Sequence, residues 1–123
     1  MRPDMAVTVP IAFPICAVST RITCVVDGDT FWLNGSKIRI ADIDTPEVGS
    51  PGCASEAALG HQATLRMREL LSAGPFDLVT VDRDEDVHGR KLRVVEREGQ
   101  SLGAMLVAEG LAGTWEGRQH EWC

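Results

Sequence analysis

The stretch ITCVVDGDTFWLNGSKIRIADIDTP, residues 22–46, decides the fold because strand-like and turn-like segments alternate along it. β-Branched and aromatic residues predict strands at 15–26, 30–33 and 37–43. Asp27-Gly28-Asp29 forms the first turn. Asn34-Gly35, whose residues both tolerate a positive φ, is a strong hairpin signal for the second. The first half is therefore predicted to be a three-stranded meander that ends at Asp44-Thr45-Pro46.

Two helices and two more strands are predicted downstream. Ser55 is a good N-cap for a helix that Ala73-Gly74-Pro75 ends, and Ser101 caps a shorter helix that closes at Gly110. Apolar residues recur at helical spacing in the first helix at Leu59, Ala63, Met67 and Leu70. Strands are expected at 76–81 and 90–96, around an acidic turn at 82–89. This order fits an α+β, mainly β fold: a five-stranded Greek-key barrel of the OB type with packed helices. An open α+β sandwich is the alternative.

Length and composition limit what the chain can be. Its 123 residues are enough for one domain, and 44% hydrophobic with 24% charged residues is ordinary for a globular protein. A net charge of -6 argues against a protein that holds DNA tightly by charge alone. We expect an extended lead-in at 1–14, a domain at 15–115 and a polar tail at 116–123. The apolar part of the lead-in is too short to span a membrane, and Asp4 and two prolines argue against a signal peptide.

The four cysteines are Cys16, Cys24, Cys53 and Cys123. No C-x-x-C pair is present, which argues against a zinc site and leaves three complete disulfide pairings open. Cys16 and Cys24 lie in apolar, strand-like sequence and are interpreted as buried free thiols. Cys53, in a loop, and Cys123 are better placed to pair with each other.

Two polar clusters are candidates for chemistry. In 27–30, 39 and 44–47, carboxylates at turns and strand ends can form an oxygen cage for a hard cation, although each motif alone is typical of turns. Arg39 and Asp44 are five positions apart, so they share a site only if the strand bends or ends between them. In His88-Gly89-Arg90 the arginine is suited to a phosphate, or else it balances Asp84 or Asp86 in a hairpin turn.

Four segments in order, VVDGDT (25–30), IRIADIDTPE (38–47), DVHGRKL (86–92) and VAEGLA (107–112), closely resemble the staphylococcal nuclease-like (thermonuclease) family. The resemblance covers roughly residues 22–115. It implies a calcium-dependent endonuclease that hydrolyses DNA and RNA phosphodiesters on the 5′ side of the phosphate. Nucleic acid is then the partner, and a monomer is expected. Calcium use and disulfides favour a periplasmic or secreted setting over a cytoplasmic one.

The resemblance also implies a role for each matched residue. The implied calcium ligands are the side chains of Asp29 and Asp44 and the backbone carbonyl of Thr45, with Asp27 nearby. Glu47 would be the general base that takes a proton from the attacking water. Arg39 and Arg90 would bind the phosphodiester and stabilise its transition state.

Some positions depart from the family pattern. The loop after Glu47 is short and lacks lysine, and a third helix is missing or much reduced. The chain has no tyrosine, so His88 stands where relatives have one, and Trp115 would stack on a base or pack the second helix against the barrel. Asp42 is interpreted as a solvent-facing strand residue, and neither His61 nor His120 is assigned a role.

Two other functions are compatible with the sequence. One is a catalytically idle OB-type module that binds nucleic acid or a protein, because fold alone does not determine function. The other is an accessory protein of polysaccharide biosynthesis and export. Retention of Arg39, Glu47 and Arg90 together with the implied calcium ligands favours the enzyme.

Overall fold

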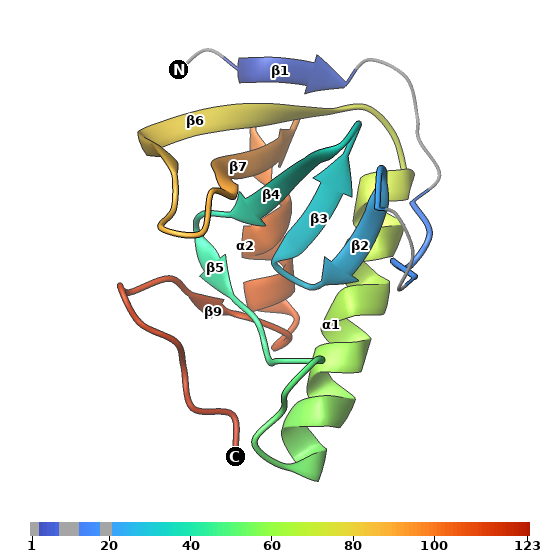
Figure 1. Ribbon diagram of the computed structural model, residues 1–123, viewed down its shortest axis with the longest axis vertical. Coiled ribbons are helices and arrows are strands. Elements are labelled where there is room, and N and C mark those ends of the chain that lie inside the picture. The colour runs from blue at the N-terminus through green and yellow to red at the C-terminus, as the bar shows by residue number, and fades with distance from the viewer. Residues whose placement is uncertain (1–2, 8–12, 18–20) are drawn as a thin grey trace.

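The described part of the chain forms a curved mixed β-sheet covered by two helices, with a short second pair of strands beside it (Figure 1). The structure is a computed structural model that describes residues 3–7, 13–17 and 21–123. The strands are β1 (Pro3–Val7), β2 (Cys24–Asp27), β3 (Thr30–Leu33), β4 (Ser36–Ile40), β5 (Ile43–Asp44), β6 (Phe76–Glu85), β7 (Lys91–Arg97), β8 (Gln100–Ser101) and β9 (Gly113–Thr114). The helices are α1 (Ala54–Ser72) and α2 (Leu102–Ala108). This is the α+β, OB-like fold that the sequence predicts.

The sheet runs in the order β1-β6-β7-β4-β3-β2, β8 pairs with β7, and β5 pairs with β9. All of these pairs are antiparallel except β4 with β7. The predicted hairpin between β3 and β4 is confirmed, with φ of 50° at Asn34 and 84° at Gly35. In this register Arg39 lies opposite Thr30 on one side and Leu92 on the other. The turn before β3 and the turn before β7 are therefore brought to the same end of β4.

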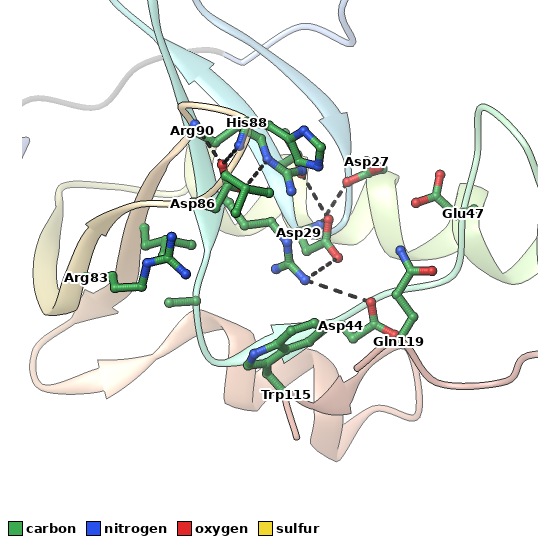
Figure 2. Close-up of a pocket in the computed structure, with 15 residues that line it drawn as sticks. Asp27, Asp29, Asp44, Glu47, Arg83, Asp86, His88, Arg90, Trp115 and Gln119 are labelled. Atoms are coloured by element: carbon green, nitrogen blue, oxygen red, sulfur yellow. Dashed lines mark hydrogen bonds and ion pairs between the residues drawn. The ribbon is translucent and has the colours of Figure 1, made fainter. Parts of the chain in front are cut away.

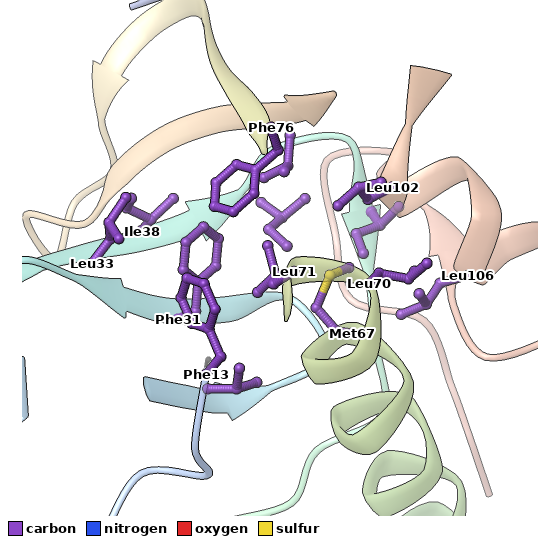
Figure 3. Close-up of a cluster of buried hydrophobic side chains, with 14 of the residues drawn as sticks. Phe13, Phe31, Leu33, Ile38, Met67, Leu70, Leu71, Phe76, Leu102 and Leu106 are labelled. Atoms are coloured by element: carbon purple, nitrogen blue, oxygen red, sulfur yellow. The ribbon is translucent and has the colours of Figure 1, made fainter. Parts of the chain in front are cut away.

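One hydrophobic core joins the sheet to both helices (Figure 3). Three phenylalanine rings lie at its centre, with centroids 5.9 to 6.4 Å apart: Phe13, Phe31 and Phe76. The helices contribute buried side chains at helical spacing: Met67, Leu70 and Leu71 from α1, and Leu102 and Leu106 from α2. This packing fixes the strand ends that carry the polar residues.

The predicted strand over 15–26 is wrong in its first part. Ile15 forms an isolated parallel bridge with Val25, and a disulfide joins Cys16 to Cys24. The Cα atoms of these cysteines are 4.8 Å apart, whereas an extended strand would separate them by about 26 Å. The segment at 13–17 therefore lies beside β2 rather than continuing into it as one strand, and the two cysteines are not free thiols. Residues 18–20 lie outside the described part.

Two other boundaries differ from prediction. Helix α1 begins at Ala54, with Cys53 rather than Ser55 at the N-cap and no side-chain cap bond. Strand β6 continues to Glu85, so the expected acidic turn is confined to the residues just before Arg90. Ser101 does cap α2, because its Oγ accepts a hydrogen bond of 3.0 Å from the amide of Ala104.

The segments at both ends of the domain are attached to it. β1, within the expected lead-in, pairs with β6, while residues 1–2 and 8–12 of that lead-in lie outside the described part. Residues 116–123, called the tail segment below, contain no helix or strand, as expected, but Cys123 is bonded to Cys53 as predicted. None of the described helices combines the length and apolarity needed to cross a bilayer.

The two disulfides close loops of very different length, which predicts a measurable difference in stability. Cys53–Cys123 spans 70 positions and Cys16–Cys24 spans 8. The chain-entropy relation gives about 4 kcal/mol for the long loop and about 2.5 kcal/mol for the short one. We expect Cys53→Ser/Cys123→Ser to lose more free energy of unfolding than Cys16→Ser/Cys24→Ser in urea titrations. Equal losses would contradict this.

Candidate active site

One pocket collects the polar residues predicted for the site (Figure 2). It opens where the turn before β3, the ends of β4 and β5, and the turn before β7 meet. Of the predicted residues it is lined by Asp27, Asp29, Arg39, Asp44, Glu47, His88, Arg90 and Trp115. Thr45 is buried and does not line the pocket.

Arg39 is fixed at the centre of this cluster. Its Nη1 donates to the carbonyl oxygens of Ile40 and Ile43, the latter at 2.8 Å. Its Nη2 lies 3.4 Å from Asp29 Oδ2 and 3.8 Å from Asp44 Oδ1. Strand β4 ends at Ile40 and the chain turns before β5, so the strand does end between Arg39 and Asp44, as a shared site requires. One guanidinium thus lies against two carboxylates.

The two carboxylates are buried and held by hydrogen bonds. Asp29 is 7% exposed and Asp44 is 3% exposed. Asp29 Oδ2 accepts from the amide of Thr45 at 3.1 Å, and its Oδ1 accepts from the hydroxyl of Thr30 at 3.0 Å. Gly28 permits this approach, because a Cβ there would lie 2.8 Å from Thr45 Cγ2. The turn before β3 is thereby joined to the end of β5.

Glu47 is positioned by helix α1. A Cβ at Gly60 would lie 2.8 Å from the carbonyl oxygen of Pro46, so only glycine lets the chain pass this close to the helix. The amide of Glu47 donates to Glu56 Oε2 at 2.9 Å, and the amide of Gly52 donates to Glu56 Oε1 at 2.7 Å. These two bonds lower the pKa of Glu56. The Glu47 side chain itself remains at the pocket.

Arg90 and His88 come from a tight turn that Asp86 organises. Asp86 Oδ1 accepts from the amides of His88 and Arg90 at 2.9 and 3.0 Å. Asp86 Oδ2 pairs with Arg90 Nε at 2.6 Å. Arg90 does balance Asp86, and because it also lines the pocket its binding of a phosphate stays a prediction compatible with that pair. Asp84 instead pairs with Lys91 and Arg93.

Trp115 forms one wall of the pocket. Its ring lies 5.3 Å from the guanidinium carbon of Arg39, in a cation–π contact, and 39% of the residue is exposed. Its amide donates to the carbonyl of Asp42 at 3.0 Å. Asp42 is half-buried rather than solvent-facing, because its Oδ2 accepts from the Ser101 hydroxyl at 2.7 Å. That bond ties the start of α2 to the chain just before β5.

Negative charge in the pocket exceeds what Arg39 balances. Burial and the charge of Asp29 raise the pKa of Asp27 to about 8. Burial, followed by the charge of Asp29, also raises the pKa of Glu47. Burial is the main cause of the raised pKa of Asp44, opposed chiefly by the hydrogen bond from His120. Such a cluster of carboxylates is stabilised by a cation.

The oxygen donors of the predicted metal site suit a hard cation that takes a few ligands from the protein and the rest from water. Within residues 3–7, 13–17 and 21–123, no three acidic, histidine or cysteine side chains make a metal site by themselves. The predicted set needs only Asp29, Asp44 and the Thr45 carbonyl. All of these donors are oxygens, which calcium prefers, and calcium completes its shell of six to eight oxygens with water. Beside this set, the hydroxyl oxygen of Thr45 is buried and has no hydrogen-bond partner among the described residues.

The raised pKa of Asp27 predicts a pH-dependent stability. A carboxyl whose folded pKa lies above its unfolded value of about 4 stabilises the fold fully below that value. That contribution is lost as the pH rises through about 8, the folded pKa. We expect Asp27→Asn, whose Oδ1 can still accept the amide of Asp29, to unfold at higher temperature than wild type at pH 8 in chelator. The difference should shrink toward pH 4, and a constant difference in thermal melts would contradict the assignment.

Sequence reasoning missed several residues that shape the pocket. Arg83 and Gln119 also line it, with Arg83 and Glu47 at opposite ends in Figure 2. His120, assigned no role from the sequence, donates its amide to Asp44 Oδ2 at 2.7 Å. A backbone donor leaves no mark in the sequence, and Arg83, Gln119 and His120 lie outside the quoted motifs.

Comparisons with known proteins agree with this architecture. The family model described as "Staphylococcal nuclease homologue" matches residues 37–121, from β4 into the tail segment. The chain is 34% identical over 100 residues to endonuclease YncB of Bacillus subtilis (strain 168), which covers 77% of this chain and 47% of the relative. It is also 34% identical over 100 residues to the SPbeta prophage-derived endonuclease YokF of the same strain, covering 77% of this chain and 33% of the relative.

This chain therefore spans half or less of the length of the two relatives. The family model, in contrast, covers well over half of this chain, including Arg39, Glu47 and Arg90. The chain belongs to the staphylococcal nuclease homologue family.

Proposed function

We propose that this protein is a calcium-dependent endonuclease that hydrolyses phosphodiester bonds of DNA and RNA. The observation that supports this most is one pocket holding Arg39 and Arg90, the buried pair Asp29 and Asp44, and Glu47. Its relatives YncB and YokF are named endonucleases. Two disulfides are typical of an oxidising compartment, so we place the protein in the periplasm or outside the cell.

Glu47 is the general base in this proposal. Its carboxylate takes a proton from a water molecule as the water oxygen attacks phosphorus. The bond from phosphorus to the 5′ oxygen breaks and that oxygen takes up a proton from solvent, which leaves a 3′-phosphate on one product and a 5′-hydroxyl on the other. A base with a pKa raised toward neutrality suits this task, and the pKa of Glu47 is raised by its surroundings.

Arg39 and Arg90 bind the phosphodiester and stabilise the charge that grows on its oxygens. Planar guanidinium groups can each make two hydrogen bonds to phosphate, which fixes its orientation. Both side chains are already oriented by carboxylates, Arg39 by Asp29 and Asp44, and Arg90 by Asp86. Such preorganised positive charge is the main source of catalysis in phosphoryl chemistry.

Asp29, Asp44 and the carbonyl of Thr45 would hold the calcium ion. The ion, when bound, supplies positive charge beside the phosphate and polarises water. Trp115 and His88, at the pocket surface, would contact the nucleotide, with the indole offering a face on which a base can stack.

Cleavage of defined substrates tests the proposal. Purified protein should shorten single-stranded DNA, double-stranded DNA and RNA in millimolar calcium, and chelator should stop the reaction. End-labelled oligonucleotides should give products with 3′-phosphate ends. Folded protein that cleaves none of the three substrates in calcium would instead favour a binding module.

A further inference from the structure

The tail segment, which runs from β9 to Cys123 (Figure 1), contributes Gln119 to the pocket lining and is attached at His120 and Cys123. A disulfide joins Cys123 to Cys53, the residue that directly precedes α1. Close to β9, a ring nitrogen of His120 lies 2.8 Å from the carbonyl oxygen of Thr114. The ring also packs on Gly113, where an added Cβ would lie 2.6 Å from it. These contacts fix the course of the segment beside the site.

The tail segment touches the proposed calcium site through Asp44. The amide of His120 donates to Asp44 Oδ2 at 2.7 Å, while Asp44 Oδ1 faces Arg39 at 3.8 Å. A hydrogen bond to a carboxylate favours its ionised form and fixes its orientation. Asp44 is thus held from one side by β4 and from the other by a residue 76 positions away in the chain.

The Cys53 end of the disulfide lies beside the hydrogen bonds that hold the backbone of Glu47. Glu56 accepts from the amides of Gly52 and Glu47, so its carboxylate ties the loop that carries Cys53 to the proposed base. Cys123 Sγ lies 3.9 Å from the same carboxylate. One covalent bond therefore joins the segment that orients Asp44 to the loop that positions Glu47.

We propose that the tail segment is a positioning strap for the calcium site, locked in place by the Cys53–Cys123 disulfide. The inference rests on the proposed calcium-dependent function. With the lock open, the amide of His120 no longer stays on Asp44 and the site needs more calcium. A dithiol reductant opens it by thiol–disulfide exchange, in which the Cys53–Cys123 bond breaks, two thiols form and the reductant becomes a disulfide.

Calcium binding measured by calorimetry tests the lock. We expect Cys53→Ser/Cys123→Ser to weaken calcium binding about tenfold, the loss expected for one hydrogen bond to a charged group. At saturating calcium, kcat should fall by no more than about threefold, because the reacting groups remain. Cys16→Ser/Cys24→Ser is the matched control: it removes a disulfide that does not touch the pocket, so its calcium affinity should equal that of wild type.

A pair of substitutions at His120 tests the hydrogen bond itself. His120→Pro removes the backbone donor to Asp44 and should weaken calcium binding as much as opening the disulfide does. His120→Ala keeps the donor and should lose less. Because the disulfide stays intact in both variants, they separate the contact on Asp44 from the loss of the covalent link, and circular dichroism verifies that each variant is folded.

The outcomes distinguish this inference from the proposed function. Wild-type calcium affinity in both Cys53→Ser/Cys123→Ser and His120→Pro overturns the strap while cleavage by the wild type leaves the nuclease in place. Equal weakening in the two double-serine variants also overturns it, since the effect would then be general destabilisation. A wild-type protein that neither binds calcium nor cleaves nucleic acid overturns both.

Discussion

Replacing Glu47 by glutamine lowers kcat for nucleic-acid cleavage by about 10² to 10⁴-fold, the range typical for loss of a general base. Glutamine has nearly the same size and keeps the backbone amide that donates to Glu56, so KM and the folded structure should change little. The measurement is the steady-state cleavage rate of a labelled oligonucleotide in saturating calcium.

Glu69→Gln is the matched control for that experiment. Glu69 lies on α1 with its side chain 68% exposed, and it does not line the pocket. Its substitution should leave kcat within about twofold of wild type, as expected for a surface change. Glu47→Gln with wild-type kcat would show that another group takes the proton, and the role proposed for Glu47 would be wrong.

Replacing Arg39 by alanine affects stability and activity together. In chelator the change leaves Asp29 and Asp44 buried without their cation, and loss of one partner of a buried pair costs about 3 kcal/mol or more. Urea unfolding should show this loss, and calcium should reduce it because a bound cation faces the same carboxylates. In calcium, kcat should fall by about 10² to 10³-fold, since one donor to the developing charge is missing.

Two companion variants make the Arg39 result specific. Arg39→Lys keeps the charge but lacks the planar fork that reaches two carbonyls and two carboxylates, so it should recover stability better than activity. Arg68→Ala removes an exposed arginine of α1 that does not line the pocket and should change neither. If Arg39→Ala were as stable as wild type in chelator, the ion pairs of Arg39 with Asp29 and Asp44 would not stabilise the fold as proposed.

The sequence predicts the part of the fold that local signals determine. Asn34-Gly35 sets the β3–β4 hairpin, Ser101 caps α2, and the ends of β4 and β5 bring Arg39 and Asp44 together. These features depend on turn and cap chemistry within a few residues. The family motifs lie in those turns and strand ends, and they therefore include most of the residues that line the pocket.

What the sequence does not predict depends on distant partners. The residues around Cys16 predict a strand, because the sequence does not show that Cys16 is bonded to Cys24. Ser55 is predicted to cap the helix, whereas the neighbouring Glu56 accepts the hydrogen bonds that order the loop. Asp42 gives no sign that Ser101 binds it. The contact of His120 with Asp44 comes from a backbone amide, which every residue but proline has.

The central claim is that this pocket hydrolyses phosphodiesters with calcium held at Asp29 and Asp44. A calcium titration of the cleavage rate, run for wild type and Asp44→Asn side by side, tests it most directly. The account predicts a rate that rises from near zero and saturates for wild type, and a requirement for at least about tenfold more calcium in the variant. A rate that persists in chelator and is the same for both proteins would contradict it.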